Sequence, residues 1–454
     1  MTRREWLSLA LLGAQVLLIA SCGGDEDDDQ PADLAPSSRT GTGSDAVKET
    51  QPITLAVLDY EGTIRDAEEV LKEWERDNIP GVPEGLALEH VTIPLAEGDY
   101  YPDQATYGFR DFLAAGEAGG VTADVVWLPF YVDIMDLFMM RTLAPLDRWL
   151  QADKHEPLEA FVEEARSLVR VRGETQALPI RIAPAVLEHN AVRFRRAELE
   201  APTHDWTWEN FIAAATQLTV DTDGDGAINR WGFASLGWFP DWLPLVMQEG
   251  GIVVDLNTGK IDMDEPATFR ALSAWDEFGR VHGILPHGPK VTLDQLEALD
   301  DYYERGMHFT PFFGHTYEPF GYVTPLPGGA SNTTPLGLVE ALGMPPSAQG
   351  EKAYAALVPL ALWLGERRVL PTTTAGWQFV AKPDGDHFDL VFPEPVKATA
   401  LESMARAKAS HVASGWKINQ WLHHNVTFPL AREEVTIEQA IQQATNWLRS
   451  YVYQ

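Results

Sequence analysis

Residues 178–219 read LPIRIAPAVLEHNAVRFRRAELEAPTHDWTWENFIAAATQLT, and the architecture of the chain is best predicted from them. The apolar run at 180–187 has the length of a strand, and a polar trio at 188–190 ends it. Thr207 is placed to cap a helix over 208–218, because its hydroxyl can accept an unpaired amide at the helix start. The apolar residues of that helix form one stripe: Phe211, Ile212, Ala215 and Leu218. The stretch therefore predicts a strand followed by an amphipathic helix that packs on a core.

The length and charge of the chain limit the class of protein. At 454 residues the chain exceeds the size at which a single core keeps growing, so two lobes are expected. Acidic residues outnumber basic ones by 67 to 34, and the formal net charge of -33 would repel a nucleic acid. Two interpretations of the charge stay open: an ordinary acidic extracytoplasmic protein, or a protein of a salt-loving host whose carboxylates keep its surface hydrated. A monomer is expected.

The first residues predict export and lipid anchoring. Arg3 and Arg4 precede an apolar stretch at 7–20 that is short for a bilayer span, so residues 1–21 are expected to be a signal peptide. The segment ends in Ile-Ala-Ser-Cys, which resembles the lipobox of bacterial and archaeal lipoproteins. This resemblance implies a diacylglycerol on Cys22. The two arginines leave open whether export follows the general or the twin-arginine route.

Residues 22–52 predict a flexible acidic tether behind the lipidated cysteine. An Asp/Glu run at 25–29 is followed by Pro, Ser, Thr and Gly with almost nothing apolar, and such a segment cannot bury enough surface to become ordered. Cys22 is also the only cysteine, which excludes an intrachain disulfide and a structural zinc–thiolate site. The folded part is therefore expected outside the cytoplasm, anchored to the cell membrane on its periplasmic or cell-surface side.

Strand and helix patterns alternate in the first part of the folded region. A β-rich run at 53–58, a helical pattern at 64–74 and a second β-rich run at 86–93 predict a βαβ unit, and a strand at 123–128 extends it. Ligands of open α/β sheets bind outside the carboxyl ends of the strands. This rule nominates the following residues as ligand-binding: Asp59, Tyr60, Trp127 and Tyr131.

A calcium-loop pattern begins at Asp221. Asp221, Asp223 and Asp225 supply hard oxygen ligands at positions 1, 3 and 5 of an EF-hand loop, followed by the glycine that allows its sharp turn. The carbonyl of Ala227 and the side chain of Asn229 would extend the ligand set, but the Glu usual at position 12 is missing. The pattern predicts a structural Ca²⁺ site that takes a further acid from elsewhere in the fold or binds weakly. The alternative is a solvated Asp/Gly turn.

Taken in order, these elements resemble one family. The succession of Leu178-Pro179, a strand, His189-Asn190, a Pro-Thr-Trp entry and an amphipathic helix is similar to that of the extracellular solute-binding proteins of ABC importers, in the sugar-binding group (family 1). An Ala-Asp-Val-Val strand at 123–126 and a Thr-x-Glu-x-Ala helix at 436–448 resemble elements of the same family.

The resemblance implies an α/β, two-lobed periplasmic-binding-protein-like fold of type II. Each lobe would be a mixed sheet flanked by helices, with hinge crossovers between the lobes. Residues 53–178 and about 308–395 would form lobe 1, and residues 179–307 and about 396–454 would form lobe 2.

A carbohydrate site stacks sugar faces on aromatic rings and binds hydroxyls with carboxylates and amides. The aromatic candidates are Trp127, Tyr131, Trp238, Trp242 and Trp377, and the polar candidates, beside Tyr60, are Asp59, Glu188 and Asn190. For any single tryptophan, core packing is the favoured interpretation, because 15 tryptophans cannot all line one site. Three are assigned to packing outright: Trp206, Trp208 and Trp275.

The family resemblance implies a membrane-anchored extracytoplasmic substrate-binding protein. It would capture a small solute, in the first place a sugar or oligosaccharide, in an inter-lobe cleft and deliver it to ABC permease subunits. The sequence lacks His-Glu-x-x-His and Gly-x-Ser-x-Gly patterns, which favours a protein without enzymatic activity. A surface lipoprotein enzyme acting on polysaccharide stays open as the alternative, because two catalytic carboxylates can lie far apart in sequence. A sensor subunit is a third option, and polyols, glycerol phosphate or peptides stay open as ligands.

Overall fold

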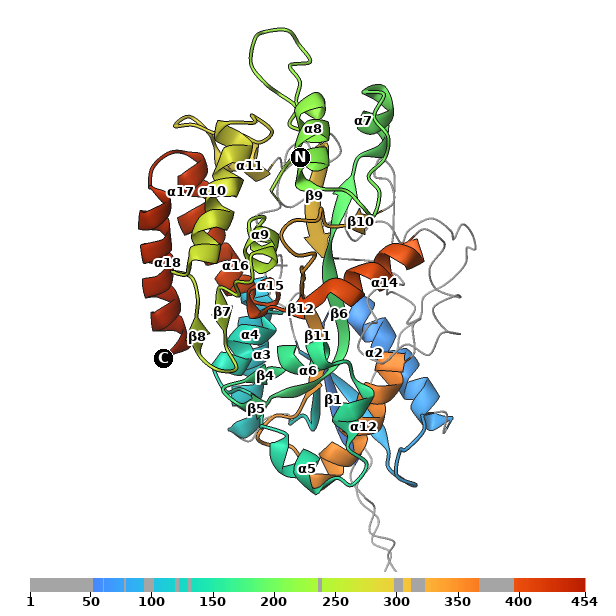
Figure 1. The fold of residues 1–454 in the computed structure, drawn as a ribbon. Helices are drawn as coiled ribbons and strands as arrows, with labels where there is room; N and C mark the ends of the chain where they lie inside the picture. The colour runs from blue at the N-terminus through green and yellow to red at the C-terminus, as the bar shows by residue number, and fades with distance from the viewer. Residues whose placement is uncertain are drawn as a thin grey trace, which may run out of the picture.

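The computed structural model describes most of the region that the sequence predicts to be folded (Figure 1). The described residues are 52–59, 61–76, 79–93, 102–118, 122–129, 132–235, 239–297, 305–311, 323–366 and 396–453. The predicted signal peptide and most of the tether, with Cys22, lie outside these ranges, as do the site candidates Tyr60, Tyr131, Trp238 and Trp377. Within the described residues, none of the helices combines the length and the apolar character that a membrane span requires.

A mixed sheet forms the core of the first lobe. β1 (Ile53–Leu58) pairs in parallel with β2 (Leu88–Ile93) on one side and with β3 (Val125–Leu128) on the other. β11 (Thr334–Gly343) lies antiparallel to β3, and β6 (Ala177–His189) lies antiparallel to β11. The strand order in this lobe is β2-β1-β3-β11-β6, so the predicted α/β class with a mixed sheet is confirmed.

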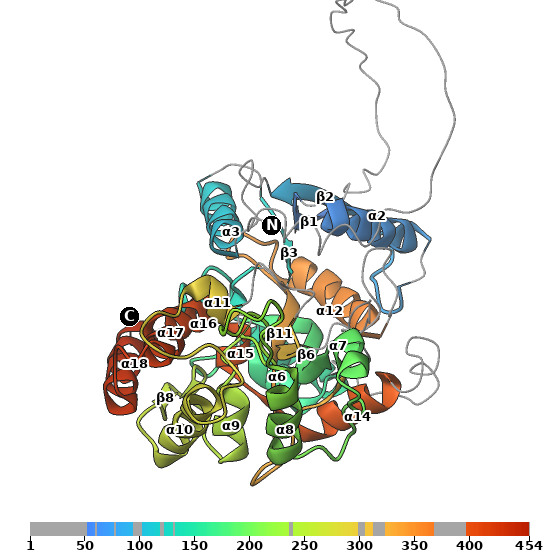
Figure 2. The same ribbon diagram turned by 90° about the horizontal axis from the view of Figure 1, so that it is seen from above.

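Helices flank this sheet on both sides. α2 (Glu61–Glu75) lies between β1 and β2 in the chain, and α3 (Pro102–Glu117) lies between β2 and β3. The two connections cross the sheet in opposite directions, so right-handed crossovers put their helices on opposite sides, as Figure 2 shows. α12 (Glu351–Glu366) lies on the side of α2. α4 (Ile134–Met139) follows β3 and carries the chain away from the carboxyl end of that strand.

Small elements then lead into β6. α5 (Asp147–Ala152) and α6 (Glu163–Leu168) precede a hairpin made of β4 (Arg170–Val171) and β5 (Glu174–Thr175). The amide of Leu146 donates to the carbonyl of Thr175 at 2.8 Å, which fixes the hairpin to the first lobe.

β6 is shared by two groups of strands. Its residues 177–184 pair with β11, whereas its residues 185–189 pair with β9 (Met307–Pro311) and β10 (Thr324–Pro325). All 13 residues of β6 are buried, and Figure 1 shows the strand running from the lower half of the molecule into the upper half. The predicted strand at 180–187 is therefore confirmed and is longer at both ends.

The second lobe has an aromatic core. This lobe contains α7 (Ala191–Arg196), α8 (Trp208–Leu218), α9 (Leu243–Gln248), α10 (Pro266–Arg280) and α11 (Leu293–Glu297). Ring centroids between 4.9 and 6.1 Å apart join five aromatic residues: Trp208, Phe211, Phe233, Phe278 and Phe309. Thr207 caps α8 as the sequence predicts, in a reciprocal capping box with Asn210. Of the predicted stripe, only Ile212 is not buried.

The end of the chain contacts both lobes. β12 (Ala407–Ala409) follows α14 (Val396–Arg406) and pairs in parallel with β11. After it come α15 (His411–Ser414), α16 (Trp416–Leu422) and α17 (Phe428–Ala431). The last helix, α18 (Ile437–Val452), lies beside α10 and begins with a Thr436 capping box. A second hairpin consists of β7 (Val254–Asp255) and β8 (Lys260–Ile261). It lies below α9 and α10, on the side of the first lobe (Figure 1).

Candidate functional site

The carboxyl ends of the first-lobe strands are the predicted ligand edge. Asp59 directly follows β1 and is exposed, and its amide donates to the carbonyl of Ile93 in β2 at 2.8 Å. Asp59 therefore presents a solvent-facing carboxylate at an anchored position of this edge. Pro129, which follows β3, is buried.

Trp127 and Trp242 lie in the cores of the two lobes. Trp127 is 2% exposed inside β3, opposite Leu342 of β11. Trp242 is 0% exposed, and its indole N–H donates to the hydroxyl of Thr427 at 3.0 Å. In this structure both rings therefore serve packing, which is the interpretation that the sequence favours for any single tryptophan. Trp275, assigned to packing, is also fully buried.

Glu188 and Asn190 have structural partners at the end of β6. The carboxylate of Glu188 lies 2.7 Å from Nε2 of His308 on β9, and both side chains are buried. Burial lowers the pKa of His308, and the carboxylate of Glu188 opposes that shift. Asn190 caps α7, because its side chain accepts the amide of Arg193 at 3.0 Å. These polar groups join strands and a helix of the second lobe.

A polar cluster joins α4 of the first lobe to the C-terminal helices. Nζ of Lys417 lies 3.0 Å from the Asp136 carboxylate, and the Tyr451 hydroxyl donates to the same oxygen at 3.3 Å. The amide of Lys417 donates to Asp133 at 2.6 Å. Burial, together with these carboxylates, raises the pKa of the Tyr451 hydroxyl. The sequence carries no signal for this cluster, because 281 and 315 positions separate Asp136 from Lys417 and Tyr451.

Three aromatic rings are stacked beside this cluster. Trp421 and Trp447 lie 4.6 Å apart at an interplanar angle of 10°, and Trp447 and Tyr451 lie 5.2 Å apart at 8°. The two indoles are half-buried, whereas Tyr451 is buried. We call these three residues the aromatic column. Because Tyr451 contacts α4, the column lies near the carboxyl end of β3. Trp447 and Tyr451 are four positions apart on one helix, a spacing that could have indicated their contact from sequence.

A buried carboxyl group lies just before α9. Asp241 is 0% exposed, and burial raises its pKa to about 8, although Ser235 and the positive charge of Arg305 act in the opposite direction. Burial therefore favours the protonated form of this carboxyl in the folded protein.

The predicted calcium loop brings its carboxylates together. One oxygen from each of Asp221, Asp223 and Asp225 lies within 4.8 Å of the others, in an exposed loop. Asp221 accepts the amides of three loop residues, and the two from glycines chiefly lower its pKa. The carboxylate of Asp225 accepts the Ala227 amide at 2.8 Å, and Asn229 accepts the amide of residue 222 at 3.0 Å. The donor set is all oxygen, which suits Ca²⁺.

The described residues form two α/β lobes that share the long strand β6. Solved structures of substrate-binding proteins are similar to this chain in fold over most of their length. The ABC substrate-binding protein Lmo0181 from Listeria monocytogenes, in complex with cycloalternan, has a TM-score of 0.62 and 18% identity over 88% of this chain and 98% of its own. The cyclic alpha-maltosyl-1,6-maltose binding protein from Arthrobacter globiformis has a TM-score of 0.63 and 15% identity, over 88% and 99%.

A third similar structure has a different kind of ligand. UgpB from Mycobacterium tuberculosis, in complex with glycerophosphocholine, has a TM-score of 0.61 and 16% identity over 89% of this chain and 98% of its own. No protein-family model matches the chain, and no curated protein matches it. At these identities the likeness establishes the two-lobed fold.

Proposed function

We propose that this protein is an extracytoplasmic solute receptor that encloses a small carbohydrate between its lobes and delivers it to an ABC permease. The observation that carries the proposal is β6, which belongs to the strand pairings of both lobes. Lobes joined by shared strands can close on a solute by a hinge motion, so affinity arises from desolvation and closure without bond chemistry. The names of the similar structures support a carbohydrate, with a glycerophosphodiester as the second ligand class.

The ligand-binding residues of the proposal come from the carboxyl edge of the first lobe and its surroundings. Asp59 would bind hydroxyl groups, and the half-buried indole of Trp421, at the end of the aromatic column, offers a ring face of the kind on which sugars stack. The aromatic candidates outside the described residues, Tyr60, Tyr131, Trp238 and Trp377, stay part of the proposal.

Membrane attachment and calcium complete the proposal. A lipid on Cys22 followed by the acidic tether would keep the receptor near the membrane that holds its permease. The loop at 221–229 would bind Ca²⁺ as a structural ion, because its carboxylates are already gathered.

A thermal-shift screen against sugars, oligosaccharides, polyols and glycerophosphodiesters tests the function. A ligand that binds only the folded state raises the unfolding temperature in proportion to occupancy. We expect one carbohydrate class to raise it in a dose-dependent way, with the ligand recovered unchanged. Product formation would instead support the polysaccharide enzyme, and a response restricted to glycerophosphodiesters would change the ligand class.

A further inference from the structure

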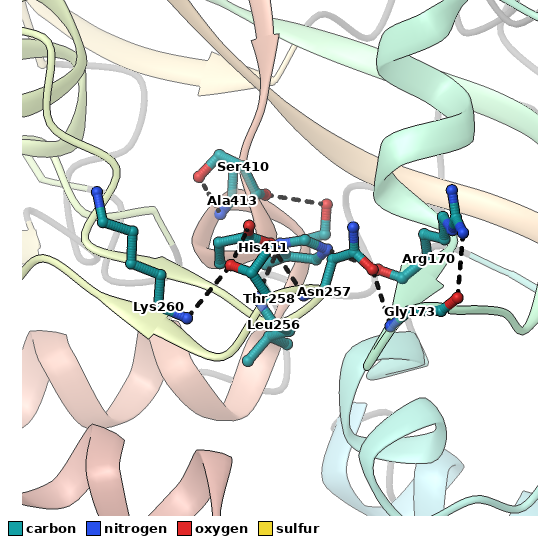
Figure 3. Close-up of polar contacts among 11 residues, drawn as sticks. Arg170, Gly173, Leu256, Asn257, Thr258, Lys260, Ser410, His411 and Ala413 are labelled. Carbon is teal, nitrogen blue, oxygen red and sulfur yellow. Dashed lines mark hydrogen bonds and ion pairs between the residues drawn. The ribbon is translucent and has the colours of Figure 1, made fainter.

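Two hairpins from opposite lobes meet around His411 (Figure 3). The β4–β5 hairpin is fixed to the first lobe, and the β7–β8 hairpin follows α9 of the second lobe. The amide of Arg172 donates to the carbonyl of Leu256 at 3.0 Å, and the amide of Gly173 donates to Oδ1 of Asn257 at 2.9 Å. These bonds connect the hairpins directly, and we call this place the hairpin junction.

The imidazole of His411 is hydrogen-bonded to both hairpins. Its Nε2 lies 3.2 Å from the carbonyl oxygen of Arg170, and its Nδ1 lies 3.3 Å from the amide nitrogen of Leu256. A carbonyl oxygen can only accept and a backbone amide can only donate, so Nε2 carries the hydrogen and Nδ1 is unprotonated. Both contacts therefore hold together only while the ring is neutral.

The ring cannot easily move away from the junction, because α15 is anchored to β11. The amide of Ser410 donates to the carbonyl of Leu336 at 2.9 Å, and the Ser410 hydroxyl caps α15 by accepting the amide of Ala413. Ala413 packs closely on Gly337 of β11, where an added Cβ would lie 2.5 Å from its atoms. A change at Nδ1 must therefore be accommodated by the β7–β8 hairpin.

Charged groups around the ring only partly favour its protonation. The nearest is the carboxylate of Asp255 on β7, 3.5 Å from Nδ1, which already accepts the Asn257 amide at 2.9 Å and the Thr258 hydroxyl at 2.6 Å. Burial lowers the pKa of His411, and the Asp255 charge opposes that shift in part. Other charged side chains on the elements around the junction are Glu164 with Lys408, Arg170, Arg172, Lys260, and Asp133 and Asp136 with Lys417.

We propose that His411 is a pH-sensitive contact between the lobes: the neutral ring adds one hydrogen bond to each hairpin of the junction, and protonation at Nδ1 breaks the bond to β7–β8. The proton replaces the acceptor of the Leu256 amide with a second donor, so that bond is lost and two N–H groups face each other. The two direct hydrogen bonds between the hairpins remain, so protonation weakens the junction without abolishing it, and the lobes separate more readily in acid. The proposal rests on the two-lobed arrangement and does not depend on the identity of a ligand.

The distance between the lobes in solution tests this proposal without any ligand. The full-length chain would carry Cys22→Ser together with Glu68→Cys in α2 and Ala213→Cys in α8, and the two new thiols would hold a donor–acceptor dye pair. Glu68 and Ala213 are exposed in the first and the second lobe. Energy transfer would be followed from pH 8 to pH 5, with circular dichroism to show that the chain stays folded. We expect the molecules to divide between two lobe separations. The ratio of these two populations should change about five- to tenfold between pH 8 and pH 5, which corresponds to the loss of one or two hydrogen bonds. The midpoint should lie below the ordinary histidine pKa.

Two variants and one control assign the response. His411→Gln is neutral at every pH and should remove the pH response, whereas His424→Gln, on an exposed histidine of the same region, should keep it. Asp255→Asn removes the facing carboxylate and should move the midpoint to lower pH. An unchanged lobe distance in the parent chain, a full response in His411→Gln, or a midpoint that rises in Asp255→Asn would overturn the proposal. A failed carbohydrate screen would leave all of these outcomes unaffected.

Discussion

The buried carboxyl of Asp241 lowers the stability of the folded protein. In the unfolded chain its carboxyl ionises near its ordinary value of 3.8, whereas in the folded protein its pKa is raised to about 8. Between these values the unfolded state releases a proton that the folded state keeps, so the group lowers stability progressively as the pH rises. Below 3.8 both states are protonated and the cost disappears. Burial of this carboxyl therefore makes the protein less stable in mild alkali.

Asp241→Asn should remove this dependence. We expect the free energy of unfolding of the variant, relative to the parent, to grow by about 1.4 kcal/mol per pH unit between about pH 5 and pH 7. Urea unfolding at both pH values measures it. Asp294→Asn, on an exposed residue, is the control and should give no such difference. A gain that is equal at the two pH values would contradict the assignment.

The aromatic column makes a residue-level prediction about ligand binding. If a sugar stacks on the half-buried indole at the end of the column, Trp421→Ala should weaken its binding about tenfold, because a ring face of contact is lost. Titration calorimetry with the carbohydrate found by screening measures this. Phe269→Ala, on a 40%-exposed aromatic residue of α10, is the matched control. Equal affinity in Trp421→Ala and the parent would remove the column from the site.

Among the secondary-structure elements, the antiparallel pair β6 and β11 contains a buried ion pair. Nη1 of Arg181 lies 3.0 Å from the Glu340 carboxylate, with each side chain 5% exposed, at an irregularity in the register of β11. Glu340→Ala would leave a buried guanidinium without this carboxylate, so we expect a loss of about 3–5 kcal/mol in urea unfolding. The double variant Arg181→Met with Glu340→Leu should recover most of that loss.

A surface pair provides the comparison for this experiment. Arg110 and Asp111 lie 3.0 Å apart with side chains 42% and 72% exposed, so Asp111→Ala should cost less than about 1 kcal/mol. If Glu340→Ala lowered the free energy of unfolding no more than Asp111→Ala does, the buried ion pair would not stabilise the pairing of β6 with β11.

The loop at 221–229 makes a second prediction for an element. Millimolar Ca²⁺ should raise the unfolding temperature by a few degrees, because binding to the folded loop stabilises it. Asp223→Asn with Asp225→Asn should abolish the effect while leaving the calcium-free unfolding temperature nearly unchanged, because both side chains are exposed. An equal response to Mg²⁺, or a response that survives the double variant, would contradict a calcium site.

The elements show where sequence reasoning succeeds and where it stops. Local signals were sufficient for α8, whose cap at Thr207 and apolar stripe lie within a dozen positions of each other. The strand at 180–187 extends to Ala177–His189 because its ends pair with β11 and β9, which lie far along the chain. The burial of Trp127 and Trp242 could not be derived from the sequence, since the residues around a tryptophan do not show whether its ring lies in a core or at a surface. Asp136 and Lys417 meet only through the tertiary fold.

At the scale of the whole molecule, the net charge of -33 should make stability depend on salt. Raising NaCl from about 0.1 M to about 1 M shortens the Debye length from about 10 Å to about 3 Å, which screens the repulsion among surface carboxylates. We expect the unfolding temperature at pH 7.5 to rise by roughly 5 °C. Near the isoelectric point the same salt step should have little effect, because the net repulsion is then small. A rise of equal size at both pH values would point to a cause other than charge.

The strand β6 also has a consequence for how the molecule is made. A ribosome releases Ala177–His189 long before it reaches β9 or β11, so a strand of 13 residues that are all buried in the folded protein waits without its partners while the intervening helices emerge. Pairings between such distant segments form slowly, and an unpaired apolar strand favours aggregation in the interval. The first lobe cannot complete its sheet until the residues of β11 have been translated. The final architecture is therefore assembled late in synthesis, and a truncated chain that ends before Thr334 is expected to require chaperones.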